Sequence, residues 1–315
     1  MNNLFINAIT YLKIFCGYET LKKYPLNRII LPSMRVLENV PLSLYTTFRL
    51  GGPARYLIEC YTIDDVKNAI KFALERNLPI LPLGAGSDVL VSDKGFNGVV
   101  IRLINLRGYK FVDNYAYIMA GEPLPKIANL TADMGLSGFE YLVGVPGTVG
   151  GGIAKNAGAH GHEIAEILEE VYVVSKEGEI LTLSPKDINI RYRESDLLKF
   201  GIAVEGKFKL KYEDPKVIKE RVREFTEYRE RTQPWKTKTA GCMFKNPPGN
   251  YAGKLIEQAG LKGFRIGGVK VSEKHANFFE NIGGTAEDAL RLIDFVRKRV
   301  YEVFGIELEV EIVII

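Results

Sequence analysis

Glycine is concentrated in one stretch of this chain. Nine of the 31 glycines fall within the 27 residues from Gly135 to Gly161. Glycine in the interior of a helix or strand is destabilising, so such a stretch indicates tight loops in which the backbone closely approaches a neighbour or a ligand. Four of these glycines lie within residues 145–152. Successive free N–H groups of a loop like this form a concave site for anions and suit a pyrophosphate.

A second glycine-rich loop lies about 60 residues earlier, in Gly84-Ala85-Gly86-Ser87-Asp88, after the apolar segment 80–83. The dinucleotide fingerprint of a Rossmann turn requires a third glycine at position 89 and a helix after it. Position 89 is a valine, and residues 89–91 predict a strand. We therefore expect no Rossmann turn here, but one extended dinucleotide between two subdomains that each contribute a loop.

The surrounding pattern predicts an α+β protein that begins with a βαβ unit. Strands are expected at 56–60, 80–83, 99–103, 202–210, 276–279 and 308–315, and a hairpin at 171–175 and 180–183. Thr62 with Asp65 three residues later predicts a capped helix over 62–77. Further helices are expected at 123–134, 214–231, 254–258 and 285–301. The helix at 214–231 should bury Val217, Ile218, Val222 and Phe225.

The composition and net charge of the chain exclude several classes of protein. Apolar residues make up 46% and charged residues 25%, which is the usual globular mixture, and the formal net charge of +4 is too small to predict nucleic-acid binding. Cys16, Cys60 and Cys242 are few and far apart, so we expect no disulfide framework and a reducing cytoplasm. No apolar run reaches the ~18 residues of a membrane span.

The first 33 residues differ from the rest. The segment 4–15 is apolar but interrupted, which predicts an accessory helix, with a peripheral membrane helix as the alternative. Met34 begins a segment that resembles a natural start. We expect residues 1–33 to be an amino-terminal extension.

Besides the two loops, 83–90 and 146–151, four further motifs stand out: Asn156-Ala157-Gly158-Ala159, Tyr192-Arg193-Glu194-Ser195, the segment 240–247, and Leu308-Glu309-Val310-Glu311. Together these motifs resemble the UDP-N-acetylenolpyruvoylglucosamine reductase family. The resemblance covers about residues 37–312. It implies an FAD-binding unit of the vanillyl-alcohol oxidase type, with subdomains at 34–103 and 104–213, a substrate-binding domain at 214–305, and a final strand, 306–315, that returns to the first subdomain.

The resemblance also implies chemistry. Such an enzyme uses non-covalently bound FAD and NADPH to reduce the enolpyruvyl ether of UDP-N-acetylglucosamine to UDP-N-acetylmuramate in peptidoglycan synthesis. Hydride comes from flavin N5, and Arg193, Cys242 and Glu311 match the catalytic positions. We expect no nucleic acid, membrane span or obligate protein partner. The residues that match FAD-binding positions are Leu83, Gly84, Ala85, Gly86, Ser87, Asp88, Pro146, Gly147, Thr148, Val149, Gly150, Gly151, Asn156 and Gly158.

Two of these positions depart from the family. Cys242 stands where the family has a serine that donates a proton, and Asp88 stands where its loop usually has asparagine. A thiol is a stronger acid than an alcohol, and we expect Cys242 to stay protonated at neutral pH. Arg193 should stabilise the enediolate that forms on the substrate, since guanidinium offers paired donors and remains charged, and Glu311 should help to hold it.

The substrate has two phosphates and a carboxylate that need partners. Candidates are Tyr192, Lys245, Asn246, Lys254 and His275. His160 and His162 have a spacing that metal ligands use, but no further ligand completes a site, so no metal is expected. His160 keeps one alternative open, which is a sugar or alcohol oxidase with the same flavin domain and a covalently attached flavin.

Overall fold

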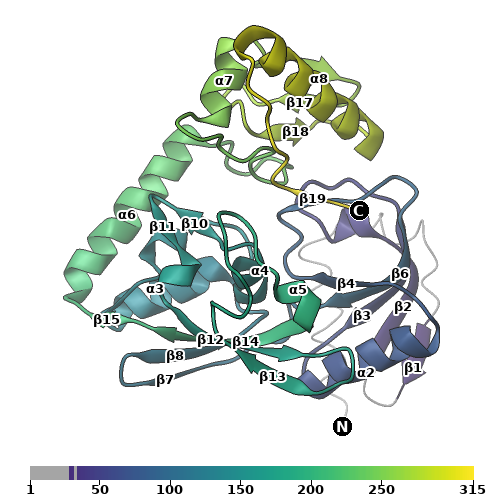
Figure 1. Cartoon of the computed structure of the whole chain (residues 1–315), viewed down its shortest axis with the longest axis vertical. Helices are drawn as coiled ribbons and strands as arrows, with labels where there is room; N and C mark the ends of the chain where they lie inside the picture. Colours follow the sequence, from purple (N-terminus) through teal and green to yellow (C-terminus); the bar gives the residue numbers. More distant parts are fainter. Residues whose placement is uncertain (1–27, 32–33) are drawn as a thin grey trace.

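The computed structural model describes residues 28–31 and 34–315, arranged as two sheet-based units with a smaller carboxy-terminal unit above them (Figure 1). The helix expected at 4–15 lies outside the described residues. The mixed α+β class is confirmed. Over the described ranges, no helix combines the length and apolarity needed to cross a bilayer.

The first unit is a five-stranded sheet in the order β1-β2-β3-β6-β4. β3, β6 and β4 run parallel, and helix α2 makes the crossover between β3 and β4. Thr62 and Asp65 form the predicted capping box at the start of α2. The bounds are β1 Arg28–Leu31, β2 Met34–Pro41, β3 Pro53–Glu59, α2 Ile63–Glu75, β4 Ile80–Leu83 and β6 Phe96–Arg102.

The second unit is an antiparallel sheet in the order β13-β12-β14-β8-β7. The predicted hairpin is present as β12 and β13, and helix α3 ends at Gly135, whose φ of 72° is the left-handed conformation that favours glycine. The bounds are β7 Tyr109–Val112, β8 Tyr115–Met119, α3 Leu124–Asp133, α4 Val149–Ala154, β12 Leu168–Val174, β13 Ile180–Leu183, α5 Leu197–Phe200 and β14 Ile202–Lys209.

The third unit follows the long helix α6, Pro215–Thr232, which runs from the second sheet up to the carboxy-terminal unit (Figure 1). There α7 and α8 pack with a three-stranded sheet, β16-β17-β18. Asp93, on the loop between β5 and β6, accepts hydrogen bonds from the N–H groups of Ala286 and Glu287, both at 2.9 Å, and so ties α8 to the first unit. The bounds are α7 Ala252–Gln258, β16 Arg265–Ile266, β17 Val269–Val271, β18 Phe279–Asn281 and α8 Ala286–Phe304.

Short elements complete the fold. β19 near the end of the chain pairs in parallel with β5, between the first and third units. The remaining bounds are β5 Val89–Leu90, β9 Leu136–Ser137, β10 Gly158–Ala159, β11 His162–Glu163, β15 Lys211–Tyr212 and β19 Val313–Ile314, with 3-10 helices η2 Leu42–Leu44, η3 Glu140–Leu142 and η4 Ile164–Glu166.

Three local predictions were wrong. The strand expected at 276–279 begins only at Phe279. Before it, the side chain of Asn277 forms hydrogen bonds with the backbone of Phe244, which take the place of regular strand pairing. The final strand is regular only over Val313–Ile314. Val217 is exposed, since the buried face of α6 runs through Ile218 and the half-buried Val222 and Phe225.

Candidate active site

The two glycine-rich loops face each other between the first two units. The Ser87 hydroxyl donates a 2.7 Å hydrogen bond to the carbonyl of Pro146. A Cβ added to Gly84 would lie 2.4 Å from Oγ1 of the buried Thr148. The loops approach so closely because neither carries a bulky side chain at this contact.

The second glycine-rich segment, expected to be a loop throughout, is a loop only up to Thr148, because Val149–Ala154 forms the short helix α4. The N–H groups of Val149 and Gly150 donate to the carbonyls of Glu122 and Ala120, both at 2.9 Å, and so hold the loop on the end of β8. A Cβ on Gly147 or Gly151 would meet nothing closer than 3.6 Å. At these two glycines an added Cβ would make only ordinary van der Waals contacts, whereas Gly150 and Gly152 are packed more tightly.

Asn156, one of the predicted cofactor residues, is buried and holds other protein segments. Its amide nitrogen donates to Glu163 Oε2 at 2.7 Å and to the carbonyl of Arg191 at 3.0 Å, while Oδ1 accepts from the N–H of Ala165 at 3.2 Å. Gly158 lies close to Arg193, whose Nη1 would be 3.0 Å from an added Cβ.

A tight turn carries Arg193. The backbones of Arg191 and Glu194 bond to each other at 2.9 and 3.2 Å, which leaves Tyr192 and Arg193 at the tip, with Arg193 at a φ of 61°. The hydroxyl of Ser195 donates to the carbonyl of Ala154 at 2.8 Å and so fixes the turn to the end of α4.

The loop that carries Cys242 lies between two other segments. Asn277 receives the N–H of Met243 on its backbone carbonyl at 2.8 Å, and its side chain bonds both backbone groups of Phe244. On the other side, the N–H of Glu311 donates to the carbonyl of Met243 at 2.8 Å. Because this loop is hydrogen-bonded on both sides, Cys242 lies close to Glu311 although the two residues are far apart in the sequence.

Arg193, Cys242 and Glu311 converge. Arg193 Nε lies 3.3 Å from Glu311 Oε1, and both side chains are mostly buried. Burial and the nearby Glu311 carboxyl raise the pKa of Cys242 to about 12, against the opposing effect of Arg193 and Arg229. Burial also raises the pKa of Glu311 to about 7, although Arg193 opposes it. The thiol therefore holds its proton at neutral pH, in line with the sequence prediction, and burial favours the protonated form of Glu311 relative to an exposed glutamate.

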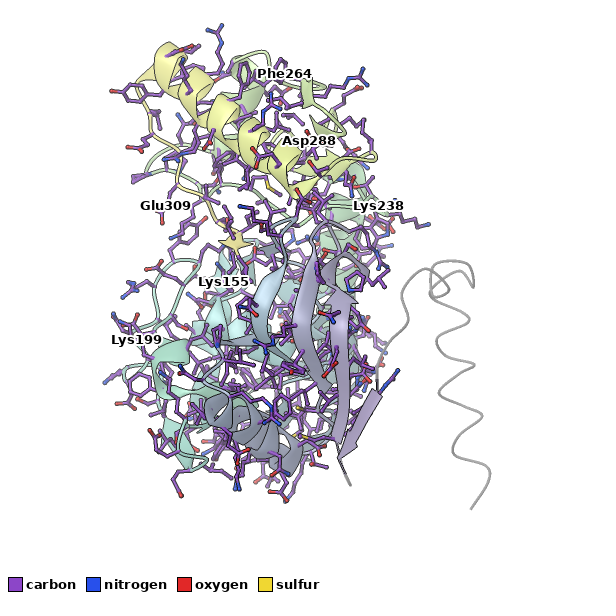
Figure 2. The ribbon with its side chains drawn as sticks, turned by 90° about the vertical axis from the view of Figure 1, so that its right-hand side faces the viewer. Lys155, Lys199, Lys238, Phe264, Asp288 and Glu309 are labelled. Carbon is purple, nitrogen blue, oxygen red and sulfur yellow. The ribbon has the colours of Figure 1, made fainter. Side chains whose placement is uncertain are left out.

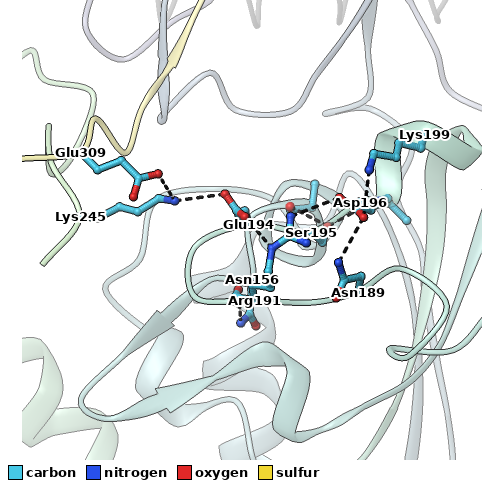
Figure 3. Close-up of polar contacts among 11 residues, drawn as sticks. Asn156, Asn189, Arg191, Glu194, Ser195, Asp196, Lys199, Lys245 and Glu309 are labelled. Carbon is cyan, nitrogen blue, oxygen red and sulfur yellow. Dashed lines mark hydrogen bonds and ion pairs between the residues drawn. The ribbon is translucent and has the colours of Figure 1, made fainter. Parts of the chain in front are cut away.

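Lys245 joins the turn to the carboxy-terminal unit. Its ammonium lies 2.6 Å from Glu309 Oε1 and 3.1 Å from Glu194 Oε2 (Figure 3). Both carboxylates belong to the protein, so this predicted substrate residue is already paired. The 191–195 turn is therefore linked to the last segment of the chain in two places. Arg193 pairs with Glu311, and Lys245 bridges Glu194 and Glu309.

The other predicted substrate residues are spread over the carboxy-terminal unit and the turn. Asn246 Oδ1 accepts the first N–H of α7, from Ala252, at 3.0 Å. His275 is half-buried beside Phe278, and burial lowers its pKa. Lys254 on α7 and Tyr192 at the tip of the turn are exposed.

Two family models match the chain. One, described as an FAD binding domain, covers residues 54–184, and the other, the UDP-N-acetylenolpyruvoylglucosamine reductase C-terminal domain, covers residues 233–315. The reductase of Rubrobacter xylanophilus is 42% identical over 86% of this chain and 92% of its own length. That of Anoxybacillus flavithermus is 40% identical over 89% of this chain and 94% of its own. The chain belongs to the UDP-N-acetylenolpyruvoylglucosamine reductase family.

The fold agrees with this family. A crystal structure of UDP-N-acetylenolpyruvylglucosamine reductase from Thermus caldophilus superposes with a TM-score of 0.78 at 38% identity, over 89% of this chain and 99% of that one. The family assignment makes the chain an oxidoreductase of peptidoglycan synthesis, a UDP-N-acetylmuramate dehydrogenase, and confirms FAD and NADPH as its cofactors. It favours the reductase over the oxidase alternative, whose candidate His160 stacks on Phe225 at 4.1 Å.

The residues present fit the FAD that UDP-N-acetylenolpyruvoylglucosamine reductases use. The backbone at Gly147 and Gly151 carries no side chain and is not tightly packed, so a flat or charged group can approach it. Gly241 has a φ of 82°, and a Cβ on it would meet only the carbonyl of Ser87, at 3.8 Å. Glycines of three segments thus lie close to Ser87 or Thr148.

Sequence reasoning missed two charged residues that lie near the converging side chains. The guanidinium of Arg229, at the end of α6, is buried, its Nε has no hydrogen-bond partner, and burial lowers its pKa. A signal existed, because position 229 continues the buried face through Ile218, Val222 and Phe225. Lys155 also lies at the centre, near the junction of the sheets and the carboxy-terminal unit (Figure 2), but nothing in its local sequence distinguishes it.

Proposed function

We propose that the three converging side chains perform the reduction of the enolpyruvyl ether, with Cys242 as the proton donor. The observation that supports this is the convergence of a protonated thiol, a guanidinium and a carboxyl of raised pKa beside the glycine loops. When bound, FAD supplies the hydride, which it receives from NADPH.

The charge that develops on the substrate explains the residue types. Once hydride is added to the terminal methylene, negative charge resides on the neighbouring carbon and spreads into the carboxylate. Arg193 places a permanent positive charge beside this group, and protonated Glu311 donates a hydrogen bond to it. Cys242 then gives its proton to the carbon and regains one from solvent.

We also propose that the substrate is held by cations and by the carboxy-terminal unit. Arg229 and Arg193 are two buried guanidinium groups, and Arg229 makes no ion pair with a described carboxylate. Lys254 and Tyr192 are exposed and available for the diphosphate, whereas Lys245 is engaged by Glu194 and Glu309. Residues 214–305 would then serve as the substrate-binding domain.

We further propose a cytoplasmic location for the protein. Both cysteines among the described residues, Cys60 and Cys242, are free thiols, which favours a reducing compartment.

An anaerobic experiment with Cys242→Ala tests the proton donor. NADPH should bleach the visible flavin absorbance of the variant as in the wild type. The return of absorbance on adding enolpyruvyl substrate should be slower by about 10²–10⁴-fold, the usual contribution of a general acid. Cys242→Ser is the matched control and should remain active. An alanine variant that reoxidises at the wild-type rate would exclude Cys242 as the donor.

A further inference from the structure

One lysine connects two acidic residues at the centre of the site. Lys155, directly after α4, places its ammonium 3.3 Å from Asp88 Oδ2 and donates a 2.8 Å hydrogen bond to the backbone carbonyl of Glu311. The Asp88 carboxylate is therefore held beside the segment that carries Glu311. Both acidic side chains are about two-thirds or more buried.

The backbone holds the same two residues together. The N–H of Val313 donates to the carbonyl of Asp88 at 3.0 Å, and β19 pairs with β5 directly after Asp88. Asp88 thus lies at the start of one strand of the pair, and Glu311 lies just before the other. Their proximity depends on paired strands, and not on flexible surface side chains.

Charged groups of both signs surround Glu311. Arg193 faces it most closely, and the other charged or titratable groups near it are Asp88, Lys155, Lys245 and Cys242. Of these, only Asp88 is an additional carboxylate of low intrinsic pKa. Burial raises the pKa of Asp88 to about 6 and that of Glu311 to about 7, and the negative charge of Asp88 adds to the rise at Glu311. In a coupled pair of this kind, one carboxyl ionises first and the second keeps its proton.

We propose that Asp88 is a positioning residue of the reduction, whose own negative charge holds the proton on Glu311. Lys155 keeps the Asp88 carboxylate in place and limits its effect. This inference rests on the proposed function, in which Glu311 must be protonated to donate a hydrogen bond to the substrate. Without Asp88, Arg193 and Lys155 would draw Glu311 into its ionised form at neutral pH, where it can only accept.

A titration without turnover tests the pair directly. The carboxyl carbon of Glu311 is followed by ¹³C NMR in protein labelled at glutamate side chains, with Glu311→Gln to assign the signal. Asp88→Asn should lower the pKa of Glu311 by about one unit or more, because a nearby like charge is lost. Lys155→Met should shift it in the opposite direction. Asp64→Asn, an exposed change of the same net charge at the start of α2, should leave it unchanged.

The pH profile of kcat/KM provides the second readout. Glu311 must be protonated, so activity falls as the pH rises through its pKa, and this alkaline limb should move to lower pH in Asp88→Asn and to higher pH in Lys155→Met. An Asp88 that only supports the loop would reduce kcat/KM equally at all pH values, leave the NMR titration unmoved, and overturn the inference. If instead the NMR shifts appear but the alkaline limb does not follow, the pairing is correct, and the role of Glu311 in the proposed function fails.

Discussion

Two halves of the site are built in different ways. The loops at 84–88 and 146–151 use backbone and the absence of side chains, and their contact requires that Gly84 carry no Cβ beside Thr148. The opposite half consists of long charged side chains, among them Arg193 and Glu311, each from a different part of the chain. Binding a large planar cofactor needs shape, whereas stabilising charge on a substrate needs fixed charges at one point.

Arg193→Ala tests the charged half. We expect kcat/KM to fall by about 10²–10³-fold, the usual loss when one preorganised donor to developing charge is removed. FAD content should not change. Arg191→Ala is the control on the same turn, since the Arg191 side chain makes only exposed ion pairs with Glu194 and Asp196. Equal losses in both variants would mean that the turn, and not the guanidinium, is what matters.

Gly84→Ala tests the backbone half. The new Cβ would lie 2.4 Å from Thr148 Oγ1, so the loops must separate, at about 1–3 kcal/mol. We expect FAD to bind about tenfold more weakly or worse, measured by fluorescence titration of the apoprotein.

Thr148→Ala should rescue this variant. It removes Oγ1, and the nearest remaining atom, Thr148 Cβ, would be 3.5 Å from the new Cβ, which is ordinary contact. Thr148 makes no side-chain capping bond to α4, so its loss should be mild by itself. A double variant as weak as the single one would show that shape at this contact does not govern FAD binding.

Arg229→Met tests whether Arg229 acts in substrate binding rather than in the stability of the fold. We expect KM for the UDP-linked substrate to rise about tenfold, as a charge-assisted contact to an anion is lost. The melting temperature should stay the same or rise, because an unpaired buried charge is destabilising. Arg231→Met, an exposed change two residues later, should alter neither value. An unchanged KM in Arg229→Met would remove Arg229 from the substrate site.

Asn156→Gly should have the smallest effect on catalysis. Glycine accepts the φ of 44° at this position, so the variant reports the side chain alone. We expect a loss of about 1–3 kcal/mol in unfolding free energy, since buried partners lose their hydrogen bonds. Denaturant unfolding measures it. A large loss of FAD with unchanged stability would instead indicate that the side chain contacts the cofactor.

Local signals predicted the secondary structure well and failed where side chains replace regular pairing. The capping box at Thr62 and the glycine after α3 are recognisable because their partners lie within a few residues. The segment around Asn277 contains strand-forming residues, yet its amide bonds Phe244, 33 residues away. A pattern of neighbouring residues cannot reveal a partner so distant in the sequence, and the strand was therefore predicted at the wrong residues.

The glycine-rich segments, the capped helices and the motifs of the reductase family could be predicted from the sequence, whereas the strands β2, β7 and β8 were missed. These features are local, since a glycine or a cap acts on its own neighbours. The bridge from Asp88 through Lys155 to the last segment, and the burial of Arg229 Nε without a partner, became visible only in the folded chain. Charge interactions depend on distance and burial, and in a folded chain both are set by segments far apart in the sequence.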